Sequence, residues 1–360
     1  MEPSTVADHE AHSPTAGGHG RVASLDLLRG LCAVAVAAYH GLSWIGLGTF
    51  HNLGLYGVYL FFLLSGASMS LAYARRFRRG YPYTSYLALR YVRLAPLYGA
   101  VALYEILSWG LARYSPAAAL GRWLLNVTFL FGFANPGGTA IATGGWSLGI
   151  EFVFYFVFPL FVAILASRAA PLLVALALGA QLVFVNVVLA GGTLLGNWAA
   201  YTQFASFIGY FACGTWLGLR FIDGKLVPAR VQSLGWLAWL ALLAAVGAGS
   251  GATDESCLTG ARGALLTAAC CALVAVTLML EVPRPIRRVA AWLGEASYPM
   301  YLVHPLIYRQ LNTSRALAPL HDHHSHAFIA LFLIVTFVAG IVIYRVFEEP
   351  ILRWGKRRIG

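Results

Sequence analysis

Apolar stretches of about 20 residues recur along almost the whole of this 360-residue chain. A helix of that length spans the roughly 30 Å hydrocarbon layer of a bilayer, and the two-residue alternation of a membrane β-barrel does not recur. Hydrophobic residues make up 59% of the chain and charged residues 11%, against about 25% charged residues in an average soluble domain. The sequence therefore predicts an all-α polytopic membrane protein.

We expect about ten transmembrane helices and a shorter partial helix at 123–133 on the outer side. The ten expected ranges are 25–47, 53–74, 94–111, 146–166, 171–190, 203–221, 233–248, 263–280, 289–311 and 327–346. Arginines cluster between the second and third ranges, and such clusters are cytoplasmic under the positive-inside rule. This orientation puts both termini in the cytoplasm and most of the chain's 25 basic residues on the inner side.

The chain divides into three expected parts. Residues 1–20 are rich in Pro, Ser, Gly and His and predict a disordered tail, 21–350 form the transmembrane domain, and 351–360 form a basic cytoplasmic tail. The net charge of +11 follows from membrane orientation and does not indicate nucleic-acid binding. Neither the five cysteines nor the histidine cluster at 321–326 has the spacing of a closed metal site, so we expect no metal.

Arg29 and His40 share one face of the first expected span. Their eleven-residue separation is about 20° more than three full turns and roughly 16 Å along the axis. Ionisable residues inside a bilayer usually face a bundle interior or a water-filled cavity. We therefore predict a polar lane along this helix, with His40 in the outer half of the membrane, Arg29 below it and Asp26 nearby.

Two further ionisable residues are expected in the outer half, near the depth of His40. Glu151 lies close to the outer end of the fourth span, where it can orient the His40 imidazole or form a structural ion pair with Arg122 or another outer arginine. His304 is either a second member of the same site or a hydrogen-bonded core histidine beside a kink at Pro305. The sequence leaves both pairs of alternatives open.

Arg90 and Arg93 lie three residues apart at the inner start of the third span, and therefore on one helix face. Arginine pairs suit phosphate groups because each guanidinium can donate two parallel hydrogen bonds. Cytoplasmic arginines are also the default in any membrane protein, so position alone favours the structural alternative.

Several segments together resemble the acyltransferase-3 family of membrane acyltransferases. LDLLRGLCAVAVAAYH at 25–40 is similar to the family signature, in which Arg, ten residues and His lie on the first span. The resemblance continues in the family's order to residue 354, through FFLLSG at 61–66, the Arg-x-x-Arg of Arg90 and Arg93, WSLGIEFVFYFVFP at 146–159, GEASYPMYLVHP at 294–305 and FEEPILRW at 347–354.

The resemblance implies an O-acetyltransferase-like enzyme of the plasma (inner) membrane. Such proteins move an acyl group, most often acetyl, from cytoplasmic acyl-coenzyme A to a hydroxyl of a sugar, a glycan or a small molecule, often on the far side of the membrane. The family's essential histidine and arginine correspond to His40 and Arg29. The chain resembles the stand-alone form, without a fused esterase-like domain.

From these observations we expect His40 to act as a general base that Glu151 orients, with Arg29 beside the reaction path. Arg90 and Arg93 are the expected acyl-CoA-binding residues, and acyl-CoA is a co-substrate rather than a bound cofactor. Further residues expected to line the site are Asp26, Trp146, Ser147, Tyr155 and His304. An acyl-histidine intermediate is the variant of this mechanism.

Two other functions are compatible with the same residues. A proton-coupled transporter of a small solute or glycan precursor also places Arg, His and Glu inside the membrane, although no inverted repeat is visible in this sequence. A non-enzymatic scaffold is the third alternative.

Overall fold

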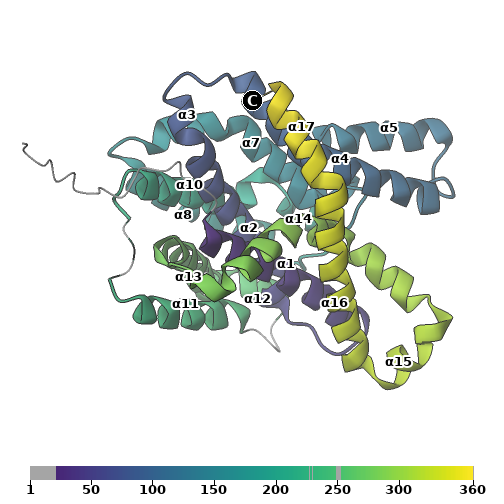
Figure 1. Ribbon diagram of the computed structural model, residues 1–360. Coiled ribbons are helices and arrows are strands. Elements are labelled where there is room, and N and C mark those ends of the chain that lie inside the picture. The colour runs from purple at the N-terminus through teal and green to yellow at the C-terminus, as the bar shows by residue number, and fades with distance from the viewer. Residues whose placement is uncertain (1–21, 227, 229, 249–252, 360) are drawn as a thin grey trace, which may run out of the picture.

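The computed structural model describes residues 22–226, 228, 230–248 and 253–359 (Figure 1). The expected disordered tail at 1–20 lies outside these residues. Within them every regular element is a helix and no strand is present. The prediction of an all-α protein is confirmed.

The helices fall into long elements that build the bundle and short ones that connect them. The long helices are α1 (Ala23–Trp44), α2 (His51–Met69), α4 (Tyr83–Glu105), α5 (Pro116–Val127), α7 (Gly145–Leu165), α8 (Ala170–Val188), α10 (Ile208–Ile222), α11 (Gln232–Gly247), α13 (Gly260–Met279), α14 (Arg284–Asn312), α16 (Ser325–Ile343) and α17 (Glu349–Ile359). The short helices are α3 (Arg75–Phe77), α6 (Pro136–Thr139), α9 (Trp198–Tyr201), α12 (Asp254–Leu258) and α15 (Ala318–His323).

Among the described residues, six helices are long and apolar enough to cross a membrane. They are α1, α2 with its continuation through α3, α7, α8, α13, and α16 with its continuation through α17. The other four expected spans are also helical, as α4, α10, α11 and α14, but α10 and α11 are short and α4 and α14 carry several charged residues. The count of ten and the cytoplasmic termini therefore stay predictions.

Three element boundaries differ from the sequence expectation. The third span was expected to start at residue 94, but α4 begins at Tyr83, because Pro82 caps it in an extended conformation. Arg90 and Arg93 therefore lie two to three turns inside a helix rather than at its start. The expected partial helix at 123–133 instead starts at Pro116 with a Ser115 cap and ends before Phe129, whose φ of 58° is left-handed. The basic segment after residue 350 continues as helix α17.

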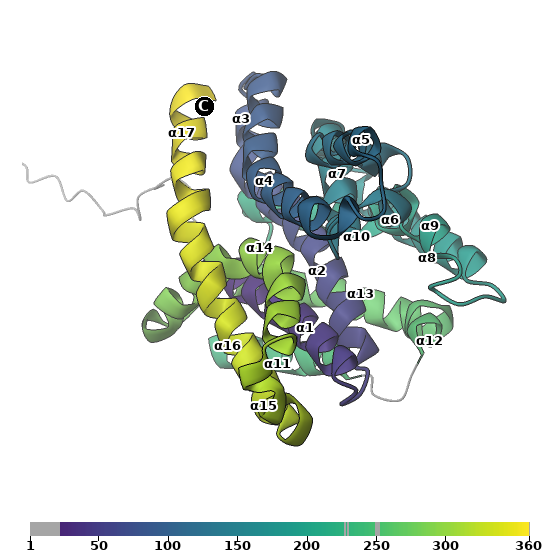
Figure 2. The same cartoon turned by 90° about the vertical axis from the view of Figure 1, so that its right-hand side faces the viewer.

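Helices α1 and α2 lie in the middle of the bundle in both ribbon views, with α14, α10 and α16 around them (Figures 1 and 2). Glycine makes the closest of these contacts possible. A Cβ on Gly214 of α10 would lie 2.0 Å from the Leu63 carbonyl oxygen of α2, and one on Gly30 of α1 would lie 2.3 Å from Leu293 Cβ of α14. Small residues at such crossings let helix backbones touch, as is common in membrane bundles.

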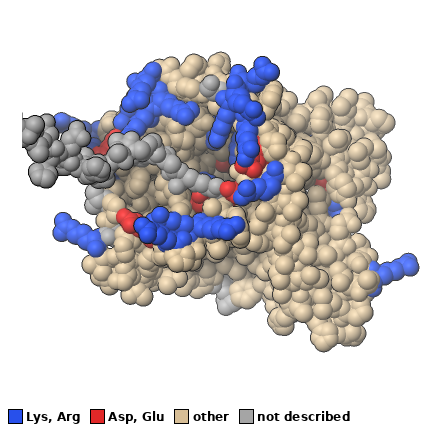
Figure 3. All heavy atoms as spheres, viewed as in Figure 1, with Lys and Arg blue, Asp and Glu red and all other residues tan. Residues whose placement is uncertain are grey.

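Many basic side chains lie at the end of the bundle formed by α3 and the end of α17. Figure 3 shows Lys and Arg there, a further group lower on the same face towards the left, and few over α15 and α16. The contributing residues of these two segments are Arg75, Arg76, Arg78, Arg79, Lys356, Arg357 and Arg358. Under the positive-inside rule, this distribution predicts that the end with α3 and α17 faces the cytoplasm.

Candidate active site

Two cavities lie between the central helices. The first, which we call the arginine cavity, has a volume of about 240 Å³ and is lined from α1, α2, α4, α7 and α14. Three arginines and one carboxylate line it: Arg29, Arg90, Arg93 and Glu151. It therefore holds an excess of positive charge inside a largely apolar bundle.

The second cavity, the histidine cavity, has a volume of about 450 Å³ and takes its name from His40. Aromatic rings make up much of its wall, including Tyr39, Trp146 and Trp198. Its remaining wall comes from the turn segment that precedes α7 and from the loop before α9, and its one carboxylate is Asp254. The histidine cavity therefore presents an imidazole and aromatic rings to a ligand, whereas the arginine cavity presents guanidinium groups.

The two cavities meet at a wall formed by Val58 of α2 and Tyr301 of α14, the two residues that line both. The Tyr301 hydroxyl lies 2.8 Å from Ser147 Oγ and donates to the carbonyl oxygen of Gly144 at 3.0 Å. Along α2 the arginine cavity uses residues 58–72, towards the basic end, and the histidine cavity uses 54–59. The cavities are therefore stacked along the helix axes, with a fixed tyrosine between them.

Arg29 and His40 lie on opposite sides of this wall. Arg29 Nη2 donates to Ser68 Oγ at 2.6 Å, and its Nη1 lies 3.9 Å from the carboxylate of Asp26, one turn earlier. Asp26 packs against Gly294, and neither cavity includes it. The expected lane is thus two cavities in series, and Asp26 lies outside both, next to Arg29.

Arg90 is held between two tyrosine rings. Its guanidinium carbon lies 4.9 Å from the centre of the Tyr73 ring and 5.9 Å from that of Tyr155, and its Nη2 donates to the Tyr73 hydroxyl at 2.9 Å. Its Nε is buried and has no hydrogen-bond partner among the described residues. A buried charged donor without a partner is rare in folded proteins and indicates room for an acceptor from a ligand.

Arg93, one turn further on, is already paired. It forms an ion pair with Glu348, whose exposed fraction is 3%, and its guanidinium lies 5.3 Å from the centre of the Tyr298 ring. Glu348 belongs to the FEEP motif, to which the sequence analysis assigned no role. The two expected acyl-CoA-binding arginines therefore differ: Arg93 has a buried carboxylate as its partner, whereas Arg90 has a buried Nε without a partner among the described residues.

The expected partner of Glu151 was wrong. Its Oε1 accepts hydrogen bonds from Ser65 Oγ at 2.9 Å and from the Tyr155 hydroxyl at 2.5 Å, so it neither orients His40 nor pairs with Arg122. Glu151 lines the arginine cavity instead. Depth along a helix, which was the basis of the expectation, does not fix the direction in which a side chain points.

His40 has a different partner, His304 of α14. His40 Nδ1 lies 3.0 Å from His304 Nε2, and the Trp44 ring stacks on His40 with an interplanar angle of 18°. His304 is completely buried and lines neither cavity. His304 is thus a hydrogen-bonded core histidine, as one of the two alternatives from the sequence expected. It also contacts His40, the candidate base, which connects it to the site that the other alternative expected.

The three remaining expected lining residues divide between the cavities. Trp146 faces the histidine cavity, and Ser147 and Tyr155 face the arginine cavity. Sequence reasoning missed Ser65, Ser68 and Tyr301, although all three lie in or beside segments that it had singled out. The sequence feature that could have identified these three residues is a side-chain hydroxyl inside an otherwise apolar span.

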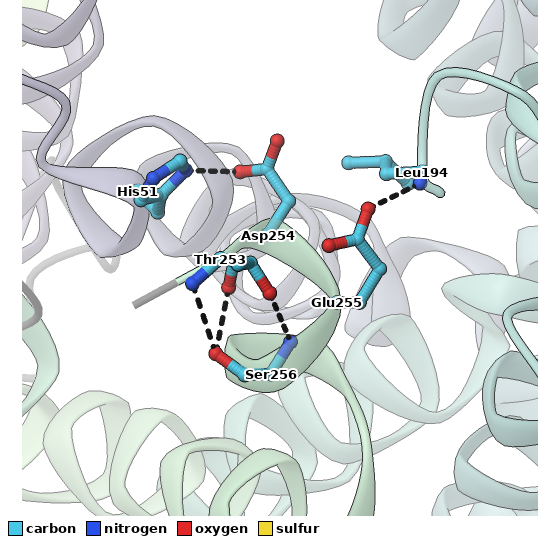
Figure 4. A network of polar contacts seen from close by, with 6 residues as sticks. All are labelled: His51, Leu194, Thr253, Asp254, Glu255 and Ser256. Atoms are coloured by element: carbon cyan, nitrogen blue, oxygen red, sulfur yellow. Dashed lines mark hydrogen bonds and ion pairs between the residues drawn. The ribbon is translucent and has the colours of Figure 1, made fainter. Parts of the chain in front are cut away.

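A network of polar contacts between the start of α2, the loop before α9 and the short helix α12 shapes the rim of the histidine cavity (Figure 4). His51 Nδ1 donates to Asp254 Oδ1 at 2.6 Å, and the backbone N–H of Leu194 donates to Glu255 at 2.5 Å. This second bond holds the pKa of the Glu255 carboxyl below its ordinary value, because it favours the charged form. A capping box of Thr253 with Ser256 starts α12 and fixes both carboxylates in place.

The buried Arg93–Glu348 pair predicts a large loss of stability on substitution. Glu348→Gln leaves Arg93 charged and unpaired, which costs about 3–5 kcal/mol in free energy of unfolding. The neighbouring Glu349→Gln is the matched control, because Glu349 pairs with the exposed Arg353 and such pairs contribute less than about 1 kcal/mol. Unfolding by SDS titration in mixed micelles measures both. If the two variants lost the same free energy of unfolding, the Arg93–Glu348 pair would not be a buried, stabilising ion pair.

Comparison with known proteins places this site in a family. Neither the curated proteins nor the solved structures that were searched contain a match to the chain. A family model described as an acyltransferase domain, of the acyltransferase-3 type, matches residues 22–345. The match includes all the residues that line the two cavities. The chain therefore belongs to the acyltransferase-3 family of membrane acyltransferases.

Proposed function

We propose that this protein transfers an acyl group, most often acetyl, from acyl-coenzyme A to a hydroxyl of a carbohydrate or glycan acceptor. One observation carries the proposal: a cation-lined cavity and a cavity with a histidine base meet at a wall of two side chains, Val58 and Tyr301. Membership of an acyltransferase family supports the reaction class.

The arginine cavity suits the acyl donor. Coenzyme A carries several phosphate charges, and Arg29 and Arg90 supply guanidinium donors close to this cavity's apolar walls. A volume of about 240 Å³ is below the roughly 300–1,000 Å³ of a drug-sized pocket, so it suits the thin pantetheine arm and not the nucleotide. The nucleotide then stays at the mouth of the cavity, towards the basic end of the bundle.

The histidine cavity suits the acceptor. Its volume of about 450 Å³ falls inside the range of roughly 300–1,000 Å³ for small-molecule sites. The rings of Trp146 and Trp198 offer flat apolar faces, and the Asp254 carboxylate at the rim accepts hydrogen bonds. Apolar faces combined with acceptors match the two surfaces of a sugar ring.

The proposed chemistry needs one base between the two substrates. His40 Nε2 removes the proton of the acceptor hydroxyl as its oxygen attacks the thioester carbonyl carbon. The carbon–sulfur bond then breaks, and the proton passes to the coenzyme A thiolate, so that ester and free thiol are the products. The two substrates approach from opposite sides of the wall, so the thioester end of the arm must pass beside Val58 and Tyr301 to reach the acceptor hydroxyl. Both reactants are then held in one complex, which replaces a chance encounter of two substrates.

The basic end of the bundle supports the proposed sidedness. If α3 and α17 face the cytoplasm, the arginine cavity opens towards the donor's compartment and the histidine cavity towards the outer face of the plasma membrane. The reaction would then acylate a glycan outside the cell from a donor inside it.

Replacing the base tests the chemistry. His40→Ala is expected to lower kcat about 10²–10⁴-fold, because general-base catalysis contributes on that scale, while abundance and thermal unfolding stay as in the wild type. The measurement is transfer of labelled acetyl from acetyl-CoA in proteoliposomes, with mass spectrometry of the acceptor. Solute flux without a covalent product would favour the transporter instead, and wild-type turnover in the variant would exclude His40 as the base.

Replacing a cation tests the donor site. Arg90→Gln is expected to raise KM for acyl-CoA roughly 10-fold or more with little change in kcat, because a hydrogen bond to a charged group contributes about 1.5–3 kcal/mol. Arg122→Gln is the control, since Arg122 lies over the Tyr114 ring and lines neither cavity. A fall in kcat with an unchanged KM for the donor would place Arg90 in the chemical step and contradict the assignment.

A further inference from the structure

A proline in α14 creates an unusual hydrogen-bond acceptor. Pro305 lies inside the helix and has no N–H, so the carbonyl oxygen of Tyr301, four residues earlier, has no helical donor. His304 Nδ1 lies 2.8 Å from this oxygen and 3.3 Å from the carbonyl oxygen of Met300. The side chain next to the proline thus satisfies the acceptor that the proline leaves open.

These two carbonyls determine which nitrogen of His304 carries the proton. A carbonyl oxygen can only accept, so Nδ1 must be the protonated nitrogen. The Nε2 nitrogen of a neutral His304 therefore bears the lone pair. A doubly protonated His304 would place a charge at a fully buried position with carbonyls and a second imidazole as its polar neighbours, which is costly.

The lone pair of His304 faces His40. The two rings have an N···N distance of 3.0 Å, a centroid separation of 5.0 Å and an interplanar angle of 21°. The ring centres are further apart than the two nitrogens, so the rings approach each other through these nitrogens, with their planes nearly parallel. This geometry points the lone pair of His304 Nε2 along an N–H bond from His40 Nδ1.

We infer that His304 is a positioning residue that holds His40 in the tautomer with its proton on Nδ1 and its lone pair on Nε2. The inference rests on the proposed function, because it gives His304 no role apart from His40. His40 can then accept the hydroxyl proton at Nε2 without rearrangement. The resulting imidazolium keeps its hydrogen bond from Nδ1 to His304, which favours the charged form.

The packing around the pair supports this role. Trp44 lies nearly parallel to both imidazoles, at 18° to His40 and 17° to His304, and its packing favours this parallel arrangement of the two rings. His304 itself lines neither cavity and cannot touch a substrate there. Its effect on the reaction must therefore pass through His40.

Two substitutions at one position separate positioning from packing. His304→Leu removes the acceptor, whereas His304→Gln keeps an amide oxygen that can accept from His40 Nδ1. We expect His304→Leu to lower kcat about 10–100-fold with KM for acetyl-CoA unchanged, and His304→Gln to recover most of that loss. Tyr308→Phe is the control on the same helix, because its ring packs on Trp44, Phe328 and Phe332 and not on His40.

Measuring His40→Ala in the same assay separates a failure of the inference about His304 from a failure of the proposed function. If His40→Ala loses turnover but His304→Leu does not, or if the Leu and Gln variants lose it equally, the inference about His304 is wrong and the proposed function stands. If His40→Ala keeps full turnover, the proposed function itself fails. In the double variant His40→Ala with His304→Leu, we expect no loss beyond that of His40→Ala alone.

The tautomer can also be read without changing His304. Nitrogen-15 NMR of the full chain in nanodiscs, labelled in histidine, separates protonated from unprotonated ring nitrogens, and the spectrum of His40→Ala identifies the His40 signals by subtraction. We expect a protonated Nδ1 and an unprotonated Nε2 at His40. A protonated Nε2 on the neutral ring would overturn the inference, even if His304→Leu did not fold.

Discussion

The contact of Tyr301 with the start of α7 is the constraint on which the rest of the site depends. The Tyr301 hydroxyl is bonded to Ser147 and to the carbonyl of Gly144, and its ring separates the two cavities. Gly144 has a φ of 77°, and a Cβ there would lie 2.8 Å from the Tyr301 hydroxyl, so the turn needs glycine. The backbone carbonyl of the same tyrosine accepts from His304. One residue thus forms the barrier on one side and fixes the base on the other.

The charges of the arginine cavity are balanced only in part. Asp26 lies near Arg29, and Glu348 pairs with Arg93. Arg90 instead contacts two tyrosine rings and the Tyr73 hydroxyl, and its Nε has no partner among the described residues. Burying a cation is costly unless it is paired, so an incompletely paired arginine is held in place by the surrounding fold. Such a cavity is organised in advance for an anionic donor, which supplies the missing acceptors when it binds.

The helical class, the family and several residues of the two cavities, among them Arg29, His40 and Arg90, followed from the sequence, because hydropathy and helical spacing act within one segment. Partnerships between segments did not follow. The spacing of Arg29 and His40 indicated a common face, but not that Tyr301 lies between their cavities. The depth of Glu151 suggested His40 as its partner, whereas the rotation of α7 turns it towards Ser65. His304, 264 residues from His40, could be identified as a partner only once α14 was seen to pack on α1.

The account's central claim is that an acyl donor enters past the arginines and reaches His40 across the wall at Val58 and Tyr301. The most direct measurement is a cryo-EM structure with an acetyl-CoA analogue whose sulfur is replaced by methylene, so that its ketone cannot be transferred. The account predicts density for the arm through the arginine cavity, with the ketone at Tyr301 and facing His40 Nε2. Density that places the analogue in the histidine cavity from the opposite face, or remote from His40, would contradict it.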